Sequence, residues 1–112
     1  LIEFGGKAVD GMVLHNHFDH GSQAPEFLRL RQIYVERFQR EPDFAVVAAY
    51  DATKAVLEAL ARRQAEQSLA EALLTRGPFI GAGDGLSFDR NGDSRRPSHI
   101  TVVRDGQFVT LR

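Results

Sequence analysis

The stretch DFAVVAAYDATKAVLEALARR, residues 43–63, decides the expected fold, because it is the longest uninterrupted helical pattern in the sequence. Pro42 cannot continue a preceding helix, and Asp43 is a good N-cap for the amide groups that follow it. Apolar residues recur every three to four positions and predict one buried face: Phe44, Val47, Tyr50, Ala52, Val56, Leu57 and Leu60. A second side carries small residues, against which another element can pack closely: Ala45, Ala48, Ala49, Ala55 and Ala59. The sequence therefore predicts an interior helix with two apolar sides.

Composition places the chain among ordinary globular domains. It has 112 residues, 43% of them hydrophobic and 26% charged, with 14 basic against 15 acidic residues and a net charge of -1. Because no basic stripe is present, nucleic acid and anionic membranes are not expected as partners. Cysteine is absent, which excludes disulfides and thiolate metal sites. The sequence begins without a methionine and reads as an excerpt from a longer polypeptide.

Two further helices and several strands are expected around the central helix. Residues 25–40 and 67–75 show helical spacing, and residues 98–104 and 107–111 flank Asp105-Gly106, a strong hairpin signal. Shorter extended pieces are expected at residues 79–80 and 86–88. This order of helices and strands predicts an α/β or α+β unit.

Residues 11–17 (GMVLHNH) form a short apolar run that predicts a buried strand. A buried strand needs a neighbour on each side, and the sequence offers few candidates. Either further polypeptide supplies the neighbours, or the chain associates with a copy of itself.

Histidines near this strand are the most prominent candidates for chemistry. His15 and His17 would point to one face of a strand, and His20 and Asp19 follow closely. A catalytic zinc site needs further ligands and an open position for water, and only His99 remains elsewhere. A strand end that runs into a polar loop is the simpler interpretation, so no metal site is predicted.

Two glycine-containing segments also lack a chemical signature. Residues 89–93 (DRNGD) do not have the glycine and glutamate spacing of an EF-hand and predict a tight turn around Asn91-Gly92. Residues 81–85 (GAGDG) lack the register of a phosphate-binding loop and predict a bend. No nucleophile–base arrangement is identifiable, so neither enzymatic activity nor a cofactor is expected.

Asp10 allows two interpretations. It directly precedes Gly11 at the start of the predicted strand, and strand ends in open α/β sheets are common ligand sites, where a carboxylate can hold an ammonium group. The alternative is a solvated aspartate in a turn, which the local sequence by itself favours.

Several segments, taken in order, resemble the C-terminal part of the type 1 periplasmic binding proteins, and most closely the branched-chain amino-acid receptors of ABC transporters. They cover most of the sequence: GKAVDGMV at 6–13, FLRLRQIYVERF at 27–38 with Pro42, AAYDA at 48–52, FIGAGDGLSFDRNGD at 79–93 and VVRDGQFV at 102–109. The resemblance implies an α/β fold: part of a two-lobed, three-layer αβα Venus-flytrap receptor that closes over a small ligand. Residues 1–24 would be a strand and crossover of the second lobe, 25–97 helices and turns of the first, and 98–112 a terminal hairpin.

The resemblance also implies a function and two ligand contacts. The intact protein would be a periplasmic or extracellular bacterial solute-binding component that delivers an amino acid or related molecule to an ABC transporter permease. Asp10 would hold the ammonium group of the ligand, and Phe44 would lie near the cleft. The alternatives are a ligand-sensing ectodomain of a membrane signalling receptor and, less favoured, a metal hydrolase that uses His15 and His17. The family often has Glu where this chain has Asp10, and the residues 15–20 do not follow its pattern.

Overall fold

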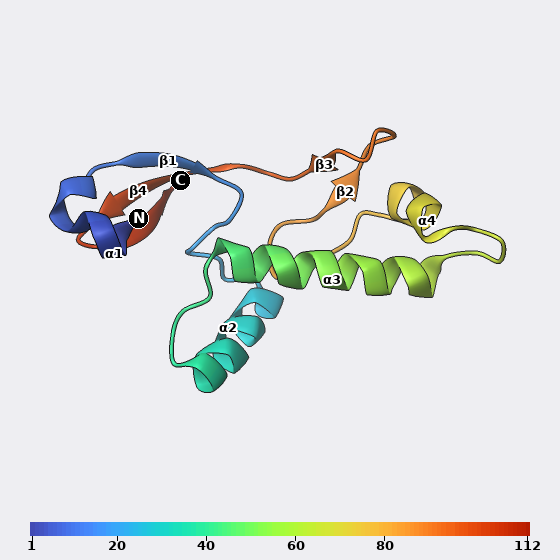
Figure 1. Ribbon diagram of the computed structural model, residues 1–112, viewed down its shortest axis with the longest axis horizontal. Coiled ribbons are helices and arrows are strands. Elements are labelled where there is room, and N and C mark those ends of the chain that lie inside the picture. The colour runs from blue at the N-terminus through green and yellow to red at the C-terminus, as the bar shows by residue number, and fades with distance from the viewer. The chain divides into compact units, whose positions relative to one another are not determined.

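The computed structural model describes all residues, 1–112. The chain divides into two compact units, which are described separately (Figure 1). The sheet unit comprises Leu1–Ser22 and Ser98–Arg112, and the helical unit comprises Gln23–Pro97. No helix is both long enough and apolar enough to cross a membrane.

The sheet unit is built around three antiparallel strands from both ends of the chain. Strand β1 (Val13–Asn16) pairs with β4 (His99–Arg104), which pairs in turn with β5 (Gln107–Leu111). A short helix α1 (Ile2–Gly5) and a 3-10 turn η1 (Gly6–Val9) precede β1. Figure 1 shows β1 and β4 side by side.

The predicted hairpin around Asp105-Gly106 is confirmed. It joins β4 to β5, and both residues have positive φ, 49° at Asp105 and 72° at Gly106. This combination belongs to the type I′ turn, whose twist matches that of the flanking strands.

The prediction that residues 11–17 form a buried strand is only half right. A strand forms, but it covers Val13–Asn16, and Val13 is 60% exposed. Strand β1 has one neighbour, β4, and lies at the edge of the three-stranded sheet. An apolar run indicates a strand that can be buried, whereas burial itself requires partners that these residues do not have within the chain.

Thr101 occupies the most buried polar position of the sheet unit. It is fully buried in β4 between Leu14 and Thr110, and its hydroxyl oxygen has no hydrogen-bond partner. A buried hydroxyl without a partner costs free energy, and valine has nearly the same shape.

We therefore expect Thr101→Val to raise the unfolding free energy of the sheet unit by about 1 kcal/mol. Amide hydrogen exchange of the β4 residues measures this change. Thr53→Val is the matched control, because the exposed Thr53 hydroxyl donates a hydrogen bond to the Ala49 carbonyl. A loss of β4 protection in Thr101→Val would contradict the prediction.

The helical unit contains the three expected helices. They are α2 (Pro25–Phe38), α3 (Phe44–Arg62) and α4 (Leu69–Thr75). Asp43 caps α3 as predicted, and its side chain accepts a hydrogen bond from the Val46 amide at 3.0 Å. Helix α4 begins two residues later than predicted, because Ser68 and Glu71 form a reciprocal capping box there.

The expected two-sided burial of α3 is wrong in this chain. Its buried residues lie on one stripe at four-residue spacing: Val47, Asp51, Ala55 and Ala59. Phe44, Leu57 and Leu60, assigned to the larger apolar face, are 65%, 61% and 41% exposed. Of the predicted small side, only Ala55 and Ala59 are buried, where neighbouring elements approach the helix axis closely.

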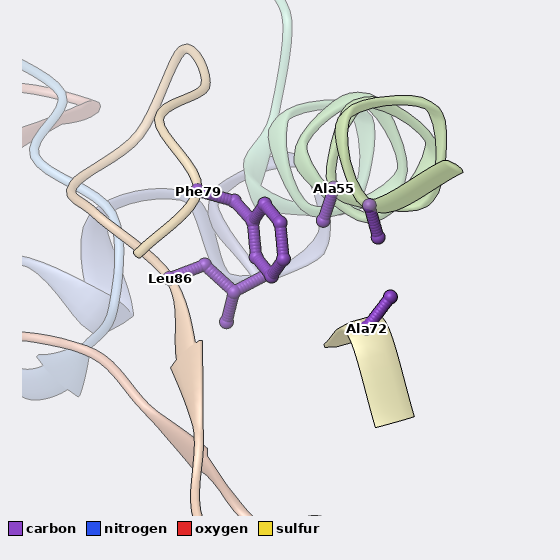
Figure 2. Close-up of a cluster of buried hydrophobic side chains, with 5 residues drawn as sticks. Ala55, Ala72, Phe79 and Leu86 are labelled. Atoms are coloured by element: carbon purple, nitrogen blue, oxygen red, sulfur yellow. The ribbon is translucent and has the colours of Figure 1, made fainter. Parts of the chain in front are cut away.

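The core of the helical unit forms where the small side of α3 meets α4 and the segment after it. Ala55 and Ala59 of α3, Ala72 of α4, and Phe79 and Leu86 form one buried cluster. Figure 2 shows Phe79 and Leu86 pointing toward Ala55, while Ala72 of α4 faces α3. Phe79 and Leu86 also exchange two backbone hydrogen bonds of 2.8 Å, which fix both side chains on one side of the loop between them.

A short hairpin follows this core. Strands β2 (Ser87–Phe88) and β3 (Ser94–Arg95) pair antiparallel, and β3 was not predicted. The turn predicted between them is confirmed: the Asp89 carboxylate accepts hydrogen bonds from the Asn91 and Asp93 amides, at 2.8 and 3.0 Å.

Candidate functional site

Asp10 lies at the hairpin end of the sheet unit. It follows η1 in an extended conformation, and its Oδ1 accepts a hydrogen bond from the Asp105 amide at 2.9 Å. The carboxylate therefore stabilises the turn between β4 and β5. The chain leaves this unit after Ser22, downstream of β1, and re-enters it at Ser98, directly before β4.

Asp10 also lines a surface depression of about 790 Å³. The other lining residues come from α1, η1 and the hairpin turn: Ile2, Gly6, Lys7, Asp105 and Gly106. Lys7 and Asp10 bring opposite charges to this depression, and Lys7 forms no ion pair. The depression can accept a small polar group, and Asp10 retains one carboxylate oxygen, Oδ2, for it.

Phe44 is the first residue of α3 and belongs to the helical unit. Its side chain is 65% exposed, so it contributes little to the core of that unit. An exposed aromatic ring at this place can contact an apolar partner or ligand group.

The histidines near β1 make separate contacts in the structure. The rings of His15 and His17 lie 5.0 Å apart, nearly perpendicular to each other. His20 instead stacks on Phe108, and Asp19 forms an ion pair with Arg112. No three His, Asp or Glu side chains are grouped so that they could hold a metal ion.

A carboxylate that sequence reasoning did not single out organises the glycine-rich loop. Asp51, in the middle of α3, is 3% exposed, and its Oδ1 accepts hydrogen bonds from the Ala82 amide at 2.7 Å and the Gly83 amide at 3.3 Å. Arg96 lies 3.6 Å from its Oδ2. Burial raises the pKa of Asp51, and the Gly83 and Ala82 amides together with Arg96 offset part of that rise.

The loop can approach Asp51 so closely because it lacks side chains. A Cβ added to Gly81 would lie 2.0 Å from Asp51 Oδ1, and one added to Gly83 would lie 2.7 Å from Oδ2. The loop amides thus bind an anion, as in a phosphate-binding loop, but the anion is a side chain of the same chain. The predicted bend is confirmed, and its glycines are explained by this contact.

Glu26 connects α2 to α3 through a second polar contact. It accepts hydrogen bonds from Tyr50 at 2.9 Å and from the Lys54 ammonium group. The Lys54 hydrogen bond, against the opposing effect of burial, holds the pKa of Glu26 below its usual value. Both polar contacts of α3 are internal and serve the fold.

Comparison with solved structures identifies the fold. The chain matches a leucine-binding protein from Thermotoga maritima over 99% of its length, with a TM-score of 0.81 and 27% identity. It matches a putative branched-chain amino-acid ABC transporter protein from Rhodospirillum rubrum over 98%, with a TM-score of 0.75 and 26% identity.

The chain has the fold of part of a type 1 periplasmic binding protein. An ABC transporter substrate-binding protein from Desulfitobacterium hafniense, solved in complex with Leu, matches 96% of the chain with a TM-score of 0.84 and 22% identity. In each of these three matches the chain spans 33% of the solved structure. No protein-family model and no curated protein sequence matches the chain.

The predicted resemblance to the periplasmic-binding-protein fold is thereby confirmed, as is the α/β class. Asp10 and Phe44 lie in different units of this fold, one at the hairpin end of the sheet unit and one at the start of α3. Their roles as ligand contacts stay predictions.

Asp51 could have been noticed in the sequence. It lies within the AAYDA motif, and an acid on the buried side of an apolar helix signals a specific partner. The sequence does not indicate, however, that this partner is the loop at residues 81–83.

Proposed function

We propose that this chain forms part of an extracytoplasmic solute-binding protein of an ABC transporter, which binds an amino acid or a related small molecule between two lobes. The proposal depends on one observation: nearly the whole chain aligns with a leucine-binding protein, at 27% identity. Two other matches, a putative branched-chain amino-acid ABC transporter protein and a substrate-binding protein solved in complex with Leu, support the same class of protein. The proposal assigns no catalytic activity to the chain.

We place the sheet unit in the second lobe and the helical unit in the first. Because β1 pairs with β4, the chain leaves the sheet unit after residue 22 and returns to it at residue 98. These two connections would then be crossings between the lobes. The terminal segment 98–112, expected as a separate hairpin, belongs to the same lobe as residues 1–22 in this proposal.

The ligand contacts are proposed to be Asp10 through its charge and Phe44 through its exposed ring. The depression beside Asp10 and the free carboxylate oxygen support the first contact. The 65% exposure of Phe44 supports the second. The competing role of Asp10 is the hydrogen bond to the hairpin turn, and an experiment can separate the two roles.

A thermal-shift screen of the intact receptor with amino acids, aromatic acids and zinc tests the function. A ligand present at a hundred times its dissociation constant should stabilise the protein by about 2.7 kcal/mol. An amino acid that raises the melting temperature supports the proposal. A response to zinc alone would contradict it and favour the histidine cluster.

Asp10→Asn then tests the ammonium contact, because asparagine keeps an oxygen for the Asp105 amide and loses the charge. An interfacial charge pair contributes roughly 2–5 kcal/mol, so we expect about 30-fold weaker binding or more with little change in stability. Asp105→Asn is the control, since it removes a charge from the same depression. If Asp10→Asn and the parent bound the ligand with equal affinity, the only role of Asp10 would be to accept the hydrogen bond from the hairpin turn.

A further inference from the structure

Residues 17–22 lead from β1 to the boundary of the sheet unit, and side chains near the end of β5 hold this segment in place. We call these contacts the clasp and define it by Phe18, Asp19, His20, Phe108 and Arg112. All five belong to the sheet unit. The sequence suggested only a polar loop here.

The polar half of the clasp is centred on Asp19. Arg112 donates a hydrogen bond from Nη2 to Asp19 Oδ2 at 2.8 Å and another to the Gly21 carbonyl at 3.3 Å. Asp19 Oδ1 accepts from the Gly21 amide at 2.9 Å, and the Asp19 carbonyl accepts from the Ser22 amide at 3.1 Å. Both carboxylate oxygens of Asp19 accept hydrogen bonds, so the carboxylate connects the backbone of residues 19–22 to Arg112.

The aromatic half of the clasp is centred on His20. Its ring stacks on Phe108 with centroids 4.9 Å apart and 19° between the planes, and it contacts the buried Phe18 at 4.5 Å. Asn16 Nδ2 lies 3.3 Å from His20 Nε2. A neutral imidazole can accept a hydrogen bond from this amide, whereas a protonated one presents a donor to it.

We propose that the clasp is a proton-sensitive latch: a proton on His20 loosens residues 17–22 from β5. The half-buried His20 ring contacts Phe18 and Phe108, and a positive charge on it would lose hydration there. The proton also removes the acceptor that faces Asn16. Acidification should therefore free the segment that leads to the helical unit. This inference does not depend on the proposed ligand.

The electrostatics of the cluster give the direction of the effect. Burial lowers the pKa of His20 below 6.5, although the Asp19 carboxylate opposes this change. Stability from a neutral His20 is therefore fully present above pH 6.5 and is lost as the pH falls through the lowered pKa.

The other charged groups of the cluster must be considered with His20. Burial raises the pKa of Asp19, but the Gly21 amide, the Thr110 side chain, Arg112 and His99 together outweigh it, so the pKa is lowered and the carboxylate stays ionised near neutral pH. His99 lies close enough to Asp19 to contribute to this shift. A variant of His99 is therefore a required control.

Amide hydrogen exchange of Gly21 and Ser22, corrected for intrinsic exchange rates, tests the latch. We expect their protection to be lower at pH 5.0 than at pH 7.5, because the released segment binds the proton on His20 more tightly than the closed one does. His20→Phe keeps the stack on Phe108 but cannot titrate, so its protection should not change with pH. His99→Gln should retain the fall, and Arg112→Gln should show low protection at both pH values.

A second measurement needs no variant. Stacking on His20 displaces the ring-proton signals of Phe108 in the magnetic resonance spectrum, and this displacement should decrease as His20 titrates. Protection that is equal at both pH values, or an identical fall in His20→Phe, would overturn the proposal. A Phe108 signal that keeps its full displacement at pH 5.0 would overturn it as well.

Discussion

Replacement of Asp51 by alanine should lower the unfolding free energy of the helical unit by about 3–5 kcal/mol, the range expected when one partner of a buried charged contact is removed. The Ala82 and Gly83 amides would lose their acceptor, and Arg96 would lose its counter-ion. Water cannot readily replace the carboxylate, because Asp51 is 3% exposed. The loop at residues 81–83 should then detach from α3.

Tyrosine fluorescence during urea unfolding measures this loss cleanly. The chain has no tryptophan, and its two tyrosines, Tyr34 and Tyr50, both lie in helices of the helical unit. Asp51→Asn should lose less than Asp51→Ala, since its amide oxygen can still accept one hydrogen bond. Gly81→Ala should approach the loss of Asp51→Ala, because its methyl group would lie 2.0 Å from the carboxylate. An unfolding free energy of Asp51→Ala within about 1 kcal/mol of that of the parent would refute the role of this contact.

The second large effect concerns Phe79. Phe79→Ala should destabilise the helical unit by about 3–5 kcal/mol, as is typical when a buried phenylalanine is truncated. The ring is 2% exposed and fills the space beside Ala55 and Leu86 (Figure 2). Alanines on α3 and α4 cannot extend into the cavity that would remain, so the cost of that cavity adds to the lost burial.

Urea unfolding followed by tyrosine fluorescence also tests this change. Phe38→Ala is the matched control, because Phe38 belongs to the same unit but is 53% exposed. We expect it to lose less than about 1 kcal/mol, as surface substitutions usually do. Equal losses in the two variants would show that Phe79 is not central to the core.

Local signals in the sequence predicted the elements well. Asp43 and Pro42 marked the start of α3, Asp105-Gly106 marked the β4–β5 hairpin, and Asn91-Gly92 marked a turn. Each depends on the conformational preferences of adjacent residues, which do not change with the rest of the fold. The resemblance of several motifs, in order, to those of the type 1 periplasmic binding proteins also predicted the fold.

The sequence predicted less well which faces of the helices and strands become buried. Periodicity gave α3 two apolar sides, but only the side with Val47, Asp51 and Ala55 is buried. The apolar run of β1 indicated burial, but β1 is an edge strand with one partner. Periodicity describes what a residue can pack against, whereas burial depends on which other segments arrive there.

The sequence by itself therefore determined the helices and the hairpin turns, because these follow from caps and glycine conformations, whereas the fold family was indicated by a resemblance to a known family. Only the tertiary structure decided the partners of Asp51, Asp19 and His20. Those contacts join residues far apart in the chain: α3 with the loop at 81–83, and residues 17–22 with the end of β5. A carboxylate or an imidazole has the same local sequence signature whether it binds a ligand, a metal or its own backbone. Its role is set by the donors, acceptors and rings that folding brings within hydrogen-bonding or stacking distance.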